Sequence, residues 1–217
     1  MSTYVAIQKE KQENDLVIVV YHGGLEYQYY PTPEMVKNFK FMVDAGADTV
    51  VSHHTHRYSG SMVYNGKPIL FGLGNFLSPT KSKVTEDWLT GIIAKIKFDK
   101  NSIDFELTPT KMSADYSQVG LANKTKSAEV FEHINNLSLV ISDENEFNKY
   151  WFNQDNKAKF IIFKLLKSNS PLEYKLRKHF SFLFKPHLSR YKNKLLLNML
   201  RCDSHRERLI RILENHK

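Results

Sequence analysis

The chain has 217 residues, of which 41% are hydrophobic and 25% charged, and its formal net charge is +8. This composition is typical of a globular protein and excludes collagen-like, mucin-like and coiled-coil chains. No apolar run reaches the length of about eighteen residues that a membrane-spanning helix requires. A single cysteine, Cys202, excludes an internal disulfide framework and a cysteine-rich zinc site.

The charge divides the chain into two regions. Residues 1–109 contain 11 Lys and Arg against 12 Asp and Glu, whereas residues 110–217 contain 20 against 11. We therefore expect a near-neutral α/β domain at 1–109, a linker at 110–126 and a basic helical region at 127–217.

The first half predicts a βαβ unit. Five consecutive apolar residues from Leu16 to Val20 favour a strand that is covered on both faces, as in parallel sheets. Thr32 is a good N-cap, Pro33 suits the first helical turn, and Gly46 suits the helix end. The expected elements are the end of an amphipathic helix in the first dozen residues, a strand at 16–21, a helix at about 33–45 and a strand at 48–52.

Antiparallel structure and then helices should follow. The turn Asn65-Gly66 predicts a hairpin, and alternating apolar residues before and after Asp99 predict a second one. From about Ser127 the chain loses glycine. Helices are expected there near 127–140, 143–152, 157–167, 171–183, 188–200 and 203–215.

Four histidines follow the two strands of the βαβ unit. His22 comes after the first strand, and His53, His54 and His56 come after the second. A single histidine at a strand end is more often a hydrogen-bonded structural residue, but the cluster favours ligand function. Neutral imidazole is a common ligand of divalent metals, and the carboxyl ends of parallel strands are the usual ligand-binding edge.

The residues around these histidines resemble the CapA-type family of capsule synthesis (poly-γ-glutamate biosynthesis) proteins, which is similar to the calcineurin-like metallophosphoesterases. The resemblance extends over residues 1–109. It rests on HGGLE at 22–26, PTPE at 31–34, DAGAD at 44–48, HHTH at 53–56, VYNGKPI at 63–69 and GLGNF at 72–76.

The resemblance implies a partial metallophosphoesterase-like α/β sandwich, made of the βαβ unit and antiparallel hairpins and followed by an α-helical region. It implies that a divalent metal ion, Mn, Fe, Zn or Mg, is bound by His22, His54 and His56. In such enzymes two ions polarise a phosphoryl group and generate hydroxide. Glu26 and Asn75 match site-supporting positions of the catalytic centre. His53 is also expected in the catalytic centre. It could hydrogen-bond either a substrate oxygen or a carbonyl, and both roles stay open.

The aspartate motifs that provide the other ligands in this family have no counterpart in the chain. We therefore expect the C-terminal portion of a longer family member, incomplete as a hydrolase by itself. An N-terminal half polypeptide or a second copy of the chain would complete it. The alternative is a non-catalytic scaffold or accessory subunit of a membrane-bound polymer synthesis complex.

Other features leave alternatives open. The basic helical region suits a solvated surface, an anionic polymer or a peripheral membrane surface, and no motif indicates specific nucleic-acid binding. Without a visible signal sequence, the expected location is the cytoplasm or the membrane periphery.

Tyr27, Tyr29 and Tyr30 suit a substrate groove or plain packing. The carboxylates of Asp15, Asp44 and Asp48 are expected to be structural. Asp87 and Trp88 follow GLGNF in a loop that can approach the site, although the spacing does not require it.

Overall fold

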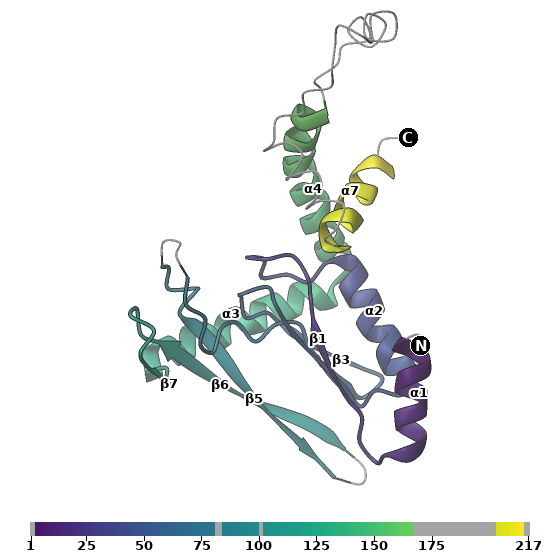
Figure 1. The fold of residues 1–217 in the computed structure, drawn as a ribbon, viewed down its shortest axis with the longest axis vertical. Helices are drawn as coiled ribbons and strands as arrows, with labels where there is room; N and C mark the ends of the chain where they lie inside the picture. The colour runs from purple at the N-terminus through teal and green to yellow at the C-terminus, as the bar shows by residue number, and fades with distance from the viewer. Residues whose placement is uncertain (1–2, 81–83, 100–101, 167–202, 215–217) are drawn as a thin grey trace, which may run out of the picture. The chain divides into compact units, whose positions relative to one another are not determined.

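The computed structural model of the chain describes residues 3–80, 84–99, 102–166 and 203–214. They divide into two compact units, Met1–Asn148 and Lys149–Lys217 (Figure 1). The first unit is a mixed α/β structure with two sheets. The expected α/β class is therefore confirmed. No helix within the described segments is long and apolar enough to cross a membrane.

The first sheet contains the expected βαβ unit. Its strand order is β1 (Ile18–His22), β2 (Thr49–His53), β4 (Lys67–Leu70) and β3 (Ser61–Tyr64). β1, β2 and β4 are parallel, and β3 is antiparallel to β4. The hairpin prediction is confirmed, with positive φ at Asn65 (49°) and Gly66 (72°) as a tight turn requires.

Helix α2 (Pro33–Asp44) joins β1 to β2 and covers one face of the sheet. Thr32 is the N-cap, as predicted, because its Oγ1 accepts a hydrogen bond from the Met35 amide at 3.1 Å. The fully buried ring of Phe39 lies edge-on to Tyr21 at 5.1 Å and stacks on Phe71 at 5.7 Å. This apolar contact fixes the helix against the strands whose ends carry the histidines.

The prediction that β1 is covered on both faces is wrong for the described residues. β1 is an edge strand, and every second residue on it faces solvent. Val20 is 68% exposed and Ile18 is 42% exposed. The apolar run predicted the strand itself, but burial depends on which other segments pack against it.

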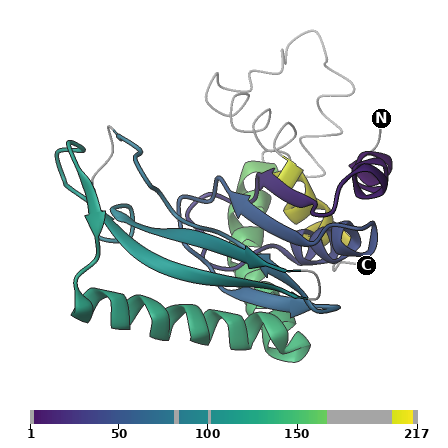
Figure 2. The same ribbon diagram turned by 90° about the horizontal axis from the view of Figure 1, so that it is seen from below.

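The second sheet has the order β5 (Thr90–Phe98), β6 (Ile103–Met112) and β7 (Val119–Leu121), all antiparallel. The second hairpin is thus confirmed. β7 was not predicted, and the expected linker 110–126 contains β7 and the end of β6. Helix α3 (Lys124–Ser142) contacts β6 and β3 and lies along this sheet (Figure 2). A small core joins Tyr58, Ile92, Val130 and Ile134.

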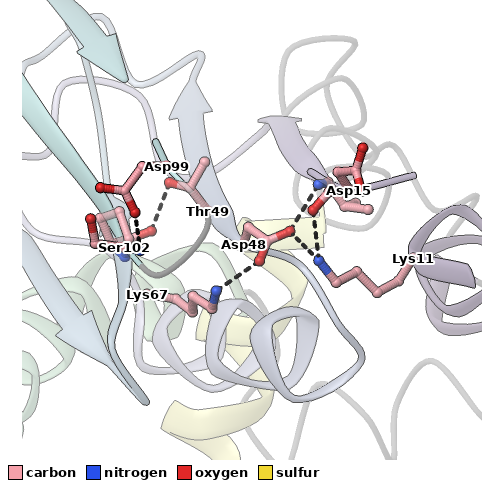
Figure 3. A network of polar contacts seen from close by, with 9 residues as sticks. Lys11, Asp15, Asp48, Thr49, Lys67, Asp99 and Ser102 are labelled. Atoms are coloured by element: carbon pink, nitrogen blue, oxygen red, sulfur yellow. Dashed lines mark hydrogen bonds and ion pairs between the residues drawn. The ribbon is translucent and has the colours of Figure 1, made fainter. Parts of the chain in front are cut away.

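A polar network lies at the opposite end of the first sheet from the histidines (Figure 3). The buried Asp48 carboxylate accepts hydrogen bonds from Lys11 Nζ and Lys67 Nζ, each at 2.7 Å, and from the Val17 amide at 2.9 Å. It thereby links helix α1 (Thr3–Glu13) to β4 and to the residue before β1. This agrees with the structural role expected for Asp48.

A pocket of about 670 Å³ opens beside this network. Its lining includes Lys11, Lys67 and Phe98. Both lysines are already paired with Asp48, and the pocket is remote from the histidines. It is therefore the weaker candidate for a functional site.

The second unit contains most of helix α4 (Glu144–Leu166) and helix α7 (Asp203–Glu214). The predicted helices at 143–152 and 157–167 form one continuous helix, because no glycine or proline interrupts the segment. The helix predicted at 203–215 is confirmed. Those predicted at 171–183 and 188–200, with most basic residues of the tail and Cys202, lie outside the described residues.

Candidate functional site

The carboxyl ends of β1 and β2 place the four histidines together. β1 and β2 are parallel and in register, with His22 opposite His53. The Gly23 amide donates to the His53 carbonyl at 3.2 Å, which extends the pairing by one residue. We call His22, His53, His54 and His56 the histidine cluster. It lies at the edge where parallel sheets usually bind ligands.

The loop after β2 turns sharply at two of these histidines. His54 has φ 96° and His56 has φ 57°, both in the left-handed region that residues other than glycine rarely adopt. The His54 ring lies 5.0 Å from the His22 ring and 6.1 Å from the His56 ring, measured between centroids. The turn therefore brings three imidazoles from two strand ends to one place.

The backbone at His54 should be strained, because a φ of 96° crowds the Cβ atom. We expect His54→Gly to be more stable than His54→Ala by about 1 kcal/mol, since both lose the imidazole and only glycine relieves the strain. Hydrogen exchange of the β2 amides in the two variants measures this difference. Equal protection in both variants would show that the loop stores no strain at this position.

Burial and neighbouring histidines favour neutral imidazoles at His53 and His54. Burial lowers the pKa of His53, and His22 lowers it further. Burial also lowers the pKa of His54; the Glu26 carboxylate opposes this shift, while His22 and His56 add to it. Glu26 Oε1 lies 3.9 Å from His54 Nε2, too far for a hydrogen bond. Neutral imidazoles retain a lone pair for a metal ion or a proton.

His56 contacts Asn75 and an aromatic group. Its Nδ1 lies 2.8 Å from Asn75 Oδ1, and Asn75 Nδ2 donates to the Trp88 carbonyl at 3.0 Å. The His56 ring stacks on Trp88 at 4.7 Å and lies 6.0 Å from Tyr27. The structure therefore brings Asn75 and Tyr27 to the cluster, as well as Trp88 from the loop before β5.

Arg57 was not singled out from the sequence. Its Nη1 lies 2.7 Å from Asp87 Oδ2, and its guanidinium carbon lies 5.3 Å from the centre of the Tyr29 ring. Arg57 and Asp87 are the neighbours of His56 and Trp88, so the ion pair joins the two loops beside the stacked rings. In the sequence, only its position directly after HHTH indicated that Arg57 lies near the site.

Tyr29 packs inward rather than lining a groove. Its ring lies edge-on to Tyr58 at 5.5 Å and to His133 of α3 at 4.6 Å. Burial raises the pKa of Tyr29 to about 12, and the neighbouring Tyr58 adds to this shift. The plain packing role is therefore the one observed for Tyr29.

The histidine cluster has the donor atoms of a metal site, but its described side chains do not converge closely enough to form a group of three ligands. Imidazole nitrogen and carboxylate oxygen suit zinc, iron and manganese. In the described part of the chain, however, no three His, Cys, Asp or Glu side chains converge into a group that could hold an ion. Of the two centroid distances given above, the one between the His22 and His54 rings is the shorter, at 5.0 Å.

The fold and the cluster define a mixed α/β protein with a histidine-lined edge on a parallel sheet. Residues 2–80 match the family described as bacterial capsule synthesis protein PGA_cap. This segment contains all six residues predicted for the site. The resemblance to the CapA-type family of capsule synthesis proteins is therefore confirmed over residues 2–80.

Several curated proteins are similar to the chain. It is 28% identical over 157 residues to the PGA biosynthesis protein CapA of Bacillus subtilis, a match that covers 72% of this chain and 38% of that protein. It is 44% identical over 68 residues to the capsule biosynthesis protein CapA of Bacillus anthracis, covering 31% and 16%. A probable polyglutamine synthesis accessory protein of Mycobacterium tuberculosis is 36% identical over 66 residues, covering 30% and 17%. The chain thus matches well under half the length of these relatives.

Proposed function

We propose that the chain acts in the synthesis of a bacterial capsule polymer of the polyglutamate type, with the histidine cluster as its working site. One observation carries this proposal: the segment that matches the capsule synthesis family folds so that its histidines, Glu26 and Asn75 meet at one sheet edge. The polymer class is suggested by the names of two relatives, which print PGA for the Bacillus subtilis protein and polyglutamine for the mycobacterial one.

The finer proposal is metal-dependent hydrolysis of a phosphoester or a related anionic linkage by a metallophosphoesterase-like site. His22 and His54 would hold one divalent ion, with His56 nearby. When bound, such an ion supplies Lewis acidity and an activated water. Because the described side chains offer too few converging ligands, we propose that another polypeptide or a second copy provides the rest, and we assign no step of hydrolysis to this chain.

A second candidate function is that of a non-catalytic accessory subunit of a membrane-bound synthesis complex. The name of the mycobacterial relative, an accessory protein, is in line with it. On this proposal the chain binds polymer or partner proteins without hydrolysing a bond.

Metal content separates the two proposals. The purified chain is loaded with Mn²⁺ or Zn²⁺ and desalted, and its bound metal and native mass are measured together. A metal-dependent site predicts that His22→Ala and His54→Ala each lower metal affinity roughly tenfold or more. His216→Ala, near the end of the chain, is the matched control and should retain metal.

Polymer binding is measured on the same variants with poly-γ-glutamate, and dextran serves as the uncharged control. Binding that needs both metal and His54 supports the metal-dependent site. Polymer binding without any bound metal, and unchanged in His22→Ala and His54→Ala, supports the accessory subunit. A folded chain that binds neither metal nor polymer contradicts the histidine cluster as the working site.

A further inference from the structure

Asn75 lies buried beside the His56 ring and uses both ends of its side-chain amide. The residue is 6% exposed. Its Oδ1 lies 2.8 Å from His56 Nδ1, and its Nδ2 lies 3.0 Å from the Trp88 carbonyl oxygen. A buried amide that bridges a ring nitrogen and a carbonyl can restrict which hydrogen atoms are present on the ring.

The Trp88 carbonyl determines the orientation of the amide. A carbonyl oxygen only accepts hydrogen bonds, so the NH₂ group of Asn75 must face Trp88. A flipped amide would place two oxygen atoms 3.0 Å apart and leave the partly buried Trp88 carbonyl without its donor, which is unfavourable. The amide oxygen therefore faces His56.

The amide oxygen in turn determines the tautomer of His56. Oδ1 only accepts, so His56 Nδ1 must carry the hydrogen atom of this hydrogen bond. A neutral imidazole has a single N–H group, and Nε2 then bears the lone pair. In the opposite tautomer, two acceptors would face each other at 2.8 Å.

The partners of Asn75 are held in place by the surrounding structure. The backbone of Asn75 packs closely against Gly91 of β5. A Cβ atom on residue 91 would lie 2.1 Å from the backbone carbonyl oxygen of Asn75, so only glycine permits this close approach. The Trp88 indole Nε1 donates to the Ser78 carbonyl at 2.8 Å, and its ring stacks on His56. The amide and the carbonyl are therefore fixed before any ligand arrives.

We propose that Asn75 is a positioning residue that holds neutral His56 in the Nδ1–H tautomer and leaves Nε2 as the atom that offers a lone pair to a ligand. Asn75 acts through His56 and touches no reacting atom itself. The use of Nε2 rests on the proposed function of the histidine cluster. The tautomer rests only on the hydrogen bonds given above.

Long-range ¹H–¹⁵N correlation spectra of the ¹⁵N-histidine-labelled chain test this proposal. The spectra are recorded about two units above the ordinary histidine pKa of 6.5, where imidazoles are neutral. The His56 signals are identified by their loss in His56→Gln. The expected result is a protonated Nδ1 and an unprotonated Nε2. A wild-type His56 with its hydrogen on Nε2 overturns the proposal without using any variant.

Two variants of nearly equal size separate positioning from simple packing. Asn75→Asp keeps the acceptor that faces His56, and Asn75→Leu removes it; both remove the donor to Trp88. We expect Asn75→Asp to keep the Nδ1–H tautomer and Asn75→Leu to shift most of the population to Nε2–H. If both variants change the tautomer equally, Asn75 only fills space. A failure of metal or polymer binding in every sample would leave this result unchanged, so the failure of this proposal is distinguishable from the failure of the proposed function.

Discussion

Replacing Asp48 by alanine is expected to lower the stability of the first unit by about 2 to 3 kcal/mol. The substitution leaves the Val17 amide without its acceptor and leaves Lys11 and Lys67 without their common partner. Both lysine side chains are more than one third exposed, so they can turn to water, which keeps the loss below that of a fully buried pair. Hydrogen exchange of the β1 and β2 amides measures the loss.

Asp44→Ala is the matched control for this prediction. Asp44 is exposed and accepts hydrogen bonds from Tyr64 and Asn65, so its replacement should change stability by about 0.5 kcal/mol or less. If Asp48→Ala has an effect no larger than this control, the buried network does not hold α1 and the strands together.

The contribution of Asp48 should depend on pH. Burial alone would raise its pKa, but hydrogen bonds from Lys11, Lys67 and the Val17 amide outweigh burial, so the folded pKa lies below the usual 3.8. A depressed carboxyl pKa contributes stability above the unfolded pKa and loses it as pH falls through the folded pKa. The advantage of the wild type over Asp48→Asn should therefore shrink below about pH 4.

Replacing Asp155 by alanine is expected to release helix α7 from α4 in the second unit. Asp155 is 6% exposed and accepts hydrogen bonds from Arg208 Nε at 3.1 Å and Arg211 Nε at 2.8 Å. Without it, two largely buried guanidinium groups lose their anionic partner, at a cost on the order of 3 kcal/mol. An isolated helix of the length of α7 is marginal in water.

Hydrogen exchange over residues 203–214 measures this release. We expect Asp155→Ala to lower the protection of these amides by roughly a hundredfold, in line with a loss of about 3 kcal/mol. Asn156→Ala changes an exposed neighbour on the same helix and should leave protection unchanged. Protection of α7 in Asp155→Ala equal to that in the control would mean that other contacts, such as the buried Ile212, hold the helix.

Local patterns predicted the elements that carry the candidate site. The apolar run before His22, the cap at Thr32 and the Asn65-Gly66 turn each specify backbone structure through neighbouring residues, and the structure confirms all three elements. The order of strands then followed from the general rule for βαβ units, so the meeting of His22 with the later histidines was also predictable.

The contacts around His56 were not predictable in the same way. Asn75 was expected at the site, but neither its bond to His56 Nδ1 nor its bond to the Trp88 carbonyl follows from spacing along the chain. Arg57 pairs with Asp87 across thirty positions of sequence. Such pairs depend on how a loop returns to the sheet, and side-chain periodicity within a segment carries no information about that return.

The α/β class, the βαβ unit, the hairpins and the family resemblance of residues 2–80 could be predicted from the amino acids alone, because each depends on short-range propensity or on matched motifs. The exposed face of β1, the binding of two lysines by Asp48 and the contact of Asn75 with His56 became known only from the packed fold. Burial and hydrogen bonding are properties of segments packed together, and their partners here are separated by many residues of chain.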